Sequence, residues 1–338
     1  MSKFRTHFVV LYNDKNKDCI SQPRSYPHGV PQGSILAPLL FSLYINDLPS
    51  ICNEDIHIQM YADDTAVLTH SKHPEKVAAS LNDAMNRIND WLDNNQLTLN
   101  TKKTVFTYFT NKKITAPPII YSRDSPLDYV TSIKYLGLHL DPNLNFKTHV
   151  KEASKKIKRS LFTFRRIRSS LSVEAAKAFF HAMIMSHFAY GVTCWSQTSD
   201  TTLKPLKLLY KQAAKILDRK DRSHHHCTIY NKSNILNFEN FIKHAQITMI
   251  HKIVNGQAPP TLNDFVALAT NSTLRPTCAS THRNCKIPNR FSNVGQSGLY
   301  RMVTTWNSLP KELKAITSHA LFSLQSRQLL LDNQTCAC

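Results

Sequence analysis

The first part of the chain alternates apolar and polar residues with the period of β-strands. The stretches 4–12, 97–109 and 132–141 all have this pattern and predict strands. Residues 56–69 alternate on both sides of a short polar centre that contains Asp63 and Asp64. This arrangement predicts a β-hairpin whose tip carries two adjacent carboxylates.

Two helices are predicted between these strands. Residues 34–47 form an apolar run that is too long for a typical strand, so we expect a buried helix with Pro38 in its first turn. Residues 77–92 predict an amphipathic helix, because five apolar residues recur there at three-to-four spacing. These residues are Val77, Leu81, Met85, Ile88 and Leu92.

After residue 141 the pattern becomes helical. Apolar residues recur at helical spacing in 148–167 and again in 202–217. From about residue 258, Pro, Ser, Thr and Asn become more frequent, which predicts a loop-rich segment before a short closing helix near 318–331. The pattern as a whole predicts an α+β fold: an antiparallel sheet with helices, followed by a helical region.

The charge balance favours a polyanionic partner. The chain has 42 Lys and Arg against 23 Asp and Glu, a formal charge of +19. The excess is concentrated in residues 146–220, with 16 basic against 4 acidic residues. Lysines at 204, 207, 211 and 215 recur at helical spacing, so one helix face is basic. An ordinary solvated face is the alternative interpretation.

Other features narrow the class of protein. No apolar run is long enough to cross a membrane, and we expect neither a signal peptide nor an anchor. The eight scattered cysteines favour free thiols, so a nuclear or cytoplasmic protein is expected. HHHC at 224–227 and CASTHRNC at 278–285 lack the paired spacing of a closed zinc site, and we expect ordinary surface loops there.

Asp63 and Asp64 allow two interpretations. Turns favour aspartate, so the pair could simply be solvated. Adjacent carboxylates also suit a divalent cation such as Mg²⁺, which binds oxygen ligands and can clamp phosphates during an in-line displacement.

Four ordered motifs favour the second interpretation. YADD at 61–64 resembles the metal-binding motif of reverse transcriptases, and GVPQGSILAPLLFSLYINDLP at 29–49 resembles their template and nucleotide-binding loop with the palm helix. LTLNTKKTVFTYF and IKYLGLHLD resemble the lysine motif and the primer-grip turn of the same family. FRTHFVV and WNSLPKEL, near the two ends of the chain, are also similar to non-LTR, LINE-type members.

The resemblance implies a fold and a set of roles. It implies an incomplete palm over 1–145, a basic helical thumb-like domain over 146–257, and a loop-rich segment with a short final helix over 258–338. The partners implied are an RNA template, a DNA primer and deoxynucleoside triphosphates, with Mg²⁺ as the cofactor. The implied metal ligands and catalytic residues are Asp63 and Asp64. The nucleotide and template residues are Gly29, Pro31, Gln32, Gly33, Tyr61, Ala62 and Lys103. The primer-grip residues are Tyr135, Leu136 and Gly137, and the residues for the nucleic-acid backbone are Lys151, Lys155, Lys204, Lys207, Lys211 and Lys215.

One part of the family pattern is missing. The family has a further aspartate on a strand upstream of the GVPQG loop, and only Asp14 and Asp18 precede Gly29 here, both in the polar NDKNKD turn. We therefore expect an amino-terminally truncated reverse transcriptase with little or no polymerase activity. The alternatives are a non-catalytic nucleic-acid-binding protein that uses its basic helices and an unrelated Mg²⁺ phosphohydrolase built on the Asp pair. The phosphohydrolase alternative leaves the GVPQGS and KYLG motifs unexplained.

Overall fold

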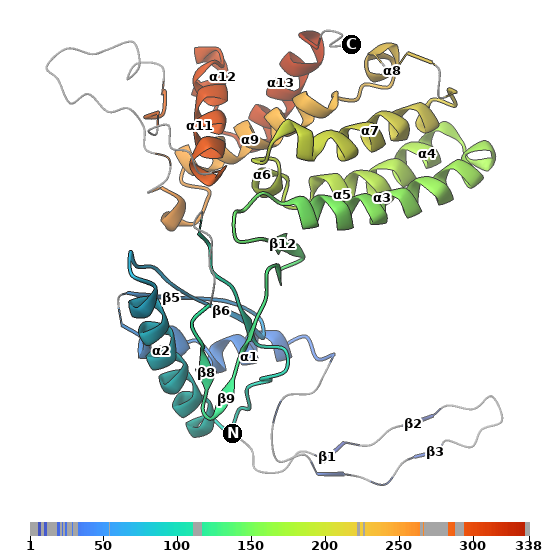
Figure 1. The fold of residues 1–338 in the computed structure, drawn as a ribbon. Coiled ribbons are helices and arrows are strands. Elements are labelled where there is room, and N and C mark those ends of the chain that lie inside the picture. The colour runs from blue at the N-terminus through green and yellow to red at the C-terminus, as the bar shows by residue number, and fades with distance from the viewer. Residues whose placement is uncertain are drawn as a thin grey trace, which may run out of the picture. The chain divides into compact units, whose positions relative to one another are not determined.

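The protein, described by a computed structural model, divides into two compact units. The first comprises Met1–Phe106 and Ala116–Asp128, and the second comprises Thr107–Thr115 and Tyr129–Cys338. Within them the structure describes residues 6–7, 10–11, 19–20, 22, 24–25, 29, 33–53, 55–110, 117–221, 224–225, 227–263, 266, 283–287 and 294–334. Both strands and helices are present, so the predicted α+β class is confirmed (Figure 1).

The first unit contains short antiparallel ladders and two α-helices. Its elements in chain order are β1 (Thr6–His7), β2 (Val10–Leu11), β3 (Cys19–Ile20), β4 (Arg24–Ser25), α1 (Ala37–Tyr44), a 3-10 helix (Leu48–Ile51), β5 (Ile56–Tyr61), β6 (Asp64–Thr69), α2 (Pro74–Asn94), β7 (Val105–Phe106), β8 (Tyr121–Ser122) and β9 (Ser125–Pro126). Strand β1 pairs with β4, β2 with β3, β5 with β6, and β8 with β9.

Helix α2 organises the core of this unit. The predicted amphipathic helix is confirmed over Pro74–Asn94, and it begins with a proline, whose missing N–H is tolerated in the first turn. Its side chains Met85, Ile88 and Trp91 are buried in one apolar cluster with Ile45 and Leu48, which follow α1. Helix α2 also contacts both strands of the β5–β6 hairpin and is therefore the platform on which the hairpin rests.

Helix α1 differs from its prediction. It begins at Ala37, with Pro38 in the first turn as expected, but the prediction of a buried helix over 34–47 is wrong. Leu39 is 57% exposed and Leu43 65% exposed, and Ala37 is the helix's buried residue. An apolar run indicates that burial would be favourable, but burial also requires a partner surface. Among the described residues, none covers Leu39 and Leu43.

The second unit is mainly helical. After β10 (Asp128–Tyr129), β11 (Ile133–Tyr135) and β12 (Leu138–Leu140) come α3 (Lys147–Ile167), α4 (Val173–Phe179), a π-helix (Phe180–Met185), α5 (Ser186–Ala189), α6 (Val192–Trp195), α7 (Asp200–Leu217), α8 (Cys227–Lys232), α9 (Phe238–Val254), α11 (Val294–Asn307), α12 (Lys311–Ala315) and α13 (His319–Asp332). Short 3-10 helices follow α3 and α9. No described helix is long and apolar enough to cross a membrane.

Two apolar clusters hold this unit together. In the first, α3 and α7 pack side by side (Figure 1) and bury the residues that their helical spacing predicted, including Ile157, Phe164 and Tyr210. The second joins α9 to α11 and α13 around Trp306. The stretch 258–338, expected to be loop-rich, thus contains α11 and α12 in addition to the expected closing helix, which is α13. The domain division expected from the sequence stays a prediction.

Candidate nucleotidyl-transfer and nucleic-acid site

The β5–β6 hairpin presents the two adjacent carboxylates, as predicted. Tyr61 pairs with Asp64 in the register, so Ala62 and Asp63 form the two-residue turn. Ala62 has a φ of 52°, in the left-handed region that residues with a Cβ rarely adopt. Asp63 and Asp64 are exposed, and within the described part of the chain their side chains form no hydrogen bond or ion pair.

The two carboxylates fit a divalent cation in type but not in number. Their oxygens are the hard ligands that Mg²⁺ prefers. Among the described residues no three His, Cys, Asp or Glu side chains gather in a metal-binding group. The pair is therefore a partial donor set.

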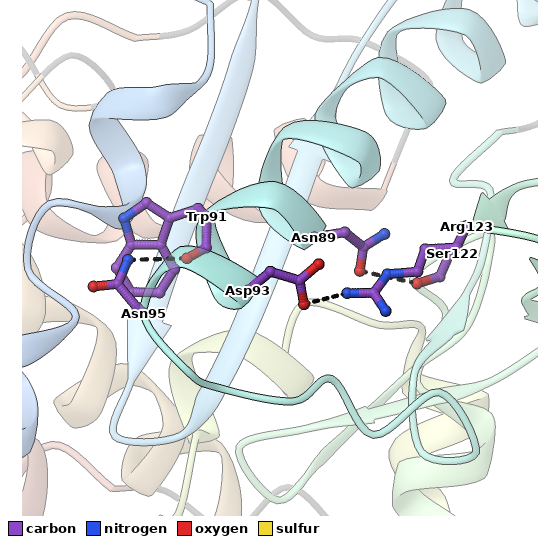
Figure 2. A network of polar contacts seen from close by, with 6 residues as sticks. All are labelled: Asn89, Trp91, Asp93, Asn95, Ser122 and Arg123. Atoms are coloured by element: carbon purple, nitrogen blue, oxygen red, sulfur yellow. Dashed lines mark hydrogen bonds and ion pairs between the residues drawn. The ribbon is translucent and has the colours of Figure 1, made fainter.

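A polar network fixes the end of α2, the platform under the hairpin (Figure 2). Ser122 Oγ donates to Asn89 Oδ1 at 3.2 Å, and Arg123 forms an ion pair with Asp93, so the β8–β9 turn is held against α2. On the other side, Trp91 Nε1 donates to Asp47 Oδ2 at 3.2 Å. The sequence motifs did not predict this network. The signal for part of it was the Trp in a helix, because a buried indole N–H needs an acceptor.

Three other predicted residues of the first unit are described, and all three are exposed: Gly29, Gly33 and Lys103. Gly29 and Gly33 are exposed with φ values of 86° and 83°, which glycine adopts without strain, and Pro31 and Gln32 lie outside the described residues. Lys103 lies in the turn after α2, where its backbone N–H donates to Asn100 O at 3.0 Å. No described hydrogen bond or ion pair joins the Lys103 side chain to the hairpin carboxylates.

The predicted primer-grip residues form a strained turn in the second unit. Tyr135 pairs with Leu138, and the two residues between them, Leu136 and Gly137, have φ values of 44° and 80°. Positive φ at both positions is the type I′ pattern, which is unfavourable for a bulky leucine. Tyr190 supports this turn, because its hydroxyl donates to the Leu136 carbonyl oxygen and its ring lies against Gly137. No motif in the sequence pointed to Tyr190.

The predicted basic residues lie on two helices, α3 and α7, and they differ in exposure and in ion pairing. On α7, Lys204 is exposed, but Lys207 forms an ion pair with Glu239, and Lys211 and Lys215 are half-buried. The α7 stripe predicted from the sequence is therefore only partly free. On α3, Lys151 is exposed, whereas Lys155, also exposed, forms an ion pair with Glu152 at 2.7 Å.

A family model matches most of the first 140 residues. The model of the family "Reverse transcriptase (RNA-dependent DNA polymerase)" matches residues 3–140, a stretch that contains the glycine loop, the carboxylate hairpin, Lys103 and the Leu136–Gly137 turn. Residues 3–140 are thus similar to reverse transcriptases. The predicted resemblance to reverse transcriptases of non-LTR retrotransposons is confirmed, since the relatives are enzymes of this kind.

Three relatives that match more than half of the chain come from Drosophila melanogaster. The "Probable RNA-directed DNA polymerase from transposon X-element" is 27% identical over 205 residues, 59% of this chain and 22% of the relative. The corresponding polymerase of transposon BS is 28% identical, covering 60% of this chain and 23% of its own length. The "RNA-directed DNA polymerase from mobile element jockey" is 26% identical, and the match covers 54% of this chain and 21% of the relative. The chain thus spans about a fifth of these relatives. No solved structure matches it.

Within residues 3–140, the structure brings some of the predicted residues together in single elements. Tyr61, Ala62, Asp63 and Asp64 form one hairpin end, and Leu136 with Gly137 forms one turn. The lysines of α3 and α7 lie beyond the segment that the family model matches.

Proposed function

We propose that this chain is a reverse-transcriptase part of a LINE-type retrotransposon protein, whose family reaction is RNA-templated DNA synthesis from a primer. The observation that supports this most strongly is the hairpin with Asp63 and Asp64, exposed and unpaired, inside the segment that matches the reverse transcriptase model. The eight scattered cysteines further support action in the nucleus or the cytoplasm.

Each proposed role is the one that the resemblance to reverse transcriptases implies, and the chemistry of the residues supports it. Asp63, and less directly Asp64, would hold Mg²⁺, which supplies neutralisation of phosphate charge when bound. Lys103 would place a cation near a triphosphate. Gly29, Pro31, Gln32 and Gly33 would let the backbone approach template and nucleotide closely, with Tyr61 and Ala62 beneath them. Tyr135, Leu136 and Gly137 would position the primer strand.

We further propose that the 338-residue chain by itself has little or no polymerase activity. Two carboxylates provide too little negative charge for two divalent cations, and no third metal-type ligand joins them among the described residues. Asp14 and Asp18, which precede the glycine loop, lie outside the described residues.

A primer-extension assay tests this proposal. Purified full chain with Mg²⁺, a primed RNA template and deoxynucleoside triphosphates is expected to extend the primer no more than its D63A/D64A variant does. Clear templated extension that the double substitution abolishes would show that the carboxylate pair is sufficient, and the proposal of inactivity would be wrong.

A second candidate function is nucleic-acid binding without catalysis. It is favoured by the exposed lysines of α3, which have no role in nucleotide chemistry. The two functions differ in whether Asp63 holds Mg²⁺. If the protein only binds nucleic acid, D63A should change neither Mg²⁺ binding nor nucleic-acid binding, and only changes of Lys or Arg should weaken the complex, whereas loss of Mg²⁺ binding in D63A would favour the reverse-transcriptase proposal.

A further inference from the structure

A groove in the second unit combines two lysines already expected to contact a nucleic-acid backbone, Lys151 and Lys155, with residues that have no role so far. It lies between α3 and the first turns of α7, with a volume of about 600 Å³. Its lining residues are Lys147, Val150, Lys151, Ser154, Lys155, Lys158, Thr201, Thr202 and Pro205. Four of these nine are lysines, none is acidic, and all four lysines are exposed.

The four lysines follow one face of α3. At 100° per residue, Lys147, Lys151, Lys155 and Lys158 fall within a sector of about 80°. With a rise of 1.5 Å per residue they extend over about 16 Å. Four cations spread over that length cannot converge on one small anion, whereas a nucleic-acid strand has a phosphate about every 3.4 Å along its axis. The spacing therefore favours an extended polyanion.

Most of this charge is available for a ligand. Lys147, Lys151 and Lys158 form no side-chain hydrogen bond or ion pair within the described part of the chain, whereas Lys155 is paired with Glu152. The α7 stripe contrasts with this, because Lys207 is already bound to Glu239. The freer of the two basic faces is the one that lines the groove.

The floor of the groove contains an unsatisfied hydroxyl. Ser154 lies between the lysine face and the apolar face of α3 and is only 8% exposed. Its Oγ has no hydrogen-bond partner, an arrangement that costs free energy in the unliganded protein. A phosphate oxygen would be a suitable acceptor for this hydroxyl.

The adjacent end of α7 adds backbone donors. Ser199 caps this helix by accepting from the Thr202 N–H at 3.4 Å, and other N–H groups of the first turn have no carbonyl partner within the helix. A helix N-terminus favours negative charge. Asp200, the acidic residue of this turn, is not among the residues that line the groove.

We propose that the α3–α7 groove binds the phosphodiester backbone of a nucleic acid, with Lys147, Lys151 and Lys158 along the strand and one phosphate over Ser154 at the start of α7. This inference deepens the proposed function and rests on it, since it states where the basic helices contact nucleic acid. It assigns the contact to α3 and adds Lys147, Lys158, Ser154 and the α7 terminus to the expected residues.

The test is a binding measurement on the full chain with a fluorescent 20-base-pair RNA–DNA hybrid between 50 and 200 mM KCl. The groove variant is K147E/K151E/K158E, and the matched control, K243E/K252E/K311E, changes the net charge equally at exposed lysines outside the groove. We expect the groove variant to bind at least about tenfold more weakly. The slope of the logarithm of its binding constant against the logarithm of the salt concentration should be shallower by about 2 to 3. The control is expected to lose less than about threefold.

A second variant tests the groove floor. S154A is expected to weaken binding about threefold with an unchanged salt slope, because the lost contact is uncharged, and to leave the melting temperature of the free protein the same or higher. Equal losses in the two triple variants, or full affinity in S154A, would overturn the groove proposal while the proposed function stands. Absence of any binding by the wild-type chain would overturn both. Equal competition by poly-glutamate of the same charge would refute the assignment to phosphodiesters.

Discussion

At the scale of single residues, His149 is a buried histidine of the second unit whose pKa lies well below its usual value. It is buried beside Trp195, with ring centroids 6.3 Å apart. Burial, together with the nearby charges of His139 and Lys156, lowers its pKa from 6.5 to about 4. The imidazole is therefore neutral in the folded protein over a range in which it is protonated in the unfolded chain.

This shift predicts acid destabilisation. Since the unfolded state binds the proton more readily, the free energy of unfolding should fall as pH decreases from about 6.5 to about 4, by at most about 3 kcal/mol from this group. H149Q should flatten that pH dependence in urea unfolding of the chain, whereas H224Q, at an exposed histidine, should not. A pH profile that H149Q leaves unchanged would contradict the assignment.

At the scale of elements, the β11–β12 hairpin depends on the segment between α5 and α6. Tyr190 supports the Leu136–Gly137 turn, and the next residue, Gly191, packs so closely that an added Cβ would lie 2.7 Å from Leu138 Cδ2. Gly191 also has a φ of 60°. Neither contact follows from the periodicity of the sequence, because both join residues about 50 positions apart.

Two glycines provide a matched test of this packing. G191A should destabilise the protein by the cost of a left-handed alanine, about 1 to 2 kcal/mol, plus about 1 to 3 kcal/mol for the steric conflict with Leu138. G256A has a similar φ of 67° but nothing within 4 Å of its Cβ, so only the first cost applies. The measurement is urea unfolding followed by circular dichroism. Equal losses in the two variants would show that Leu138 moves aside freely.

At the scale of the whole molecule, exposed apolar surface on α1 is expected to govern solubility. Leu39 and Leu43 lie on this helix with more than half of their surface exposed, beside the exposed Ile35 and Leu36. Contiguous apolar patches promote association. L39K/L43K should therefore reduce self-association in sedimentation velocity while changing the free energy of unfolding by less than about 0.5 kcal/mol. The control V173K/L208K alters two isolated exposed apolar residues and should leave self-association unchanged. An equal effect of both variants would argue against an α1 patch.

The sequence by itself determined the local elements with strong periodicity and the chemistry of the motifs. Helices α2, α3 and α7 and the β5–β6 hairpin follow from apolar spacing, because each places its apolar side chains on one face. The reverse transcriptase motifs are also visible in the sequence, because each is a short contiguous string of residues.

Only the tertiary structure decided which surfaces are covered and which charges are free. It left α1 exposed, paired Lys207 with Glu239, and placed Tyr190 over the Leu136–Gly137 turn. It also brought the α3 lysines and the start of α7 to one groove. The physical reason is that burial and ion pairing depend on neighbours distant in the chain, whereas periodicity describes only the face that an element offers to them.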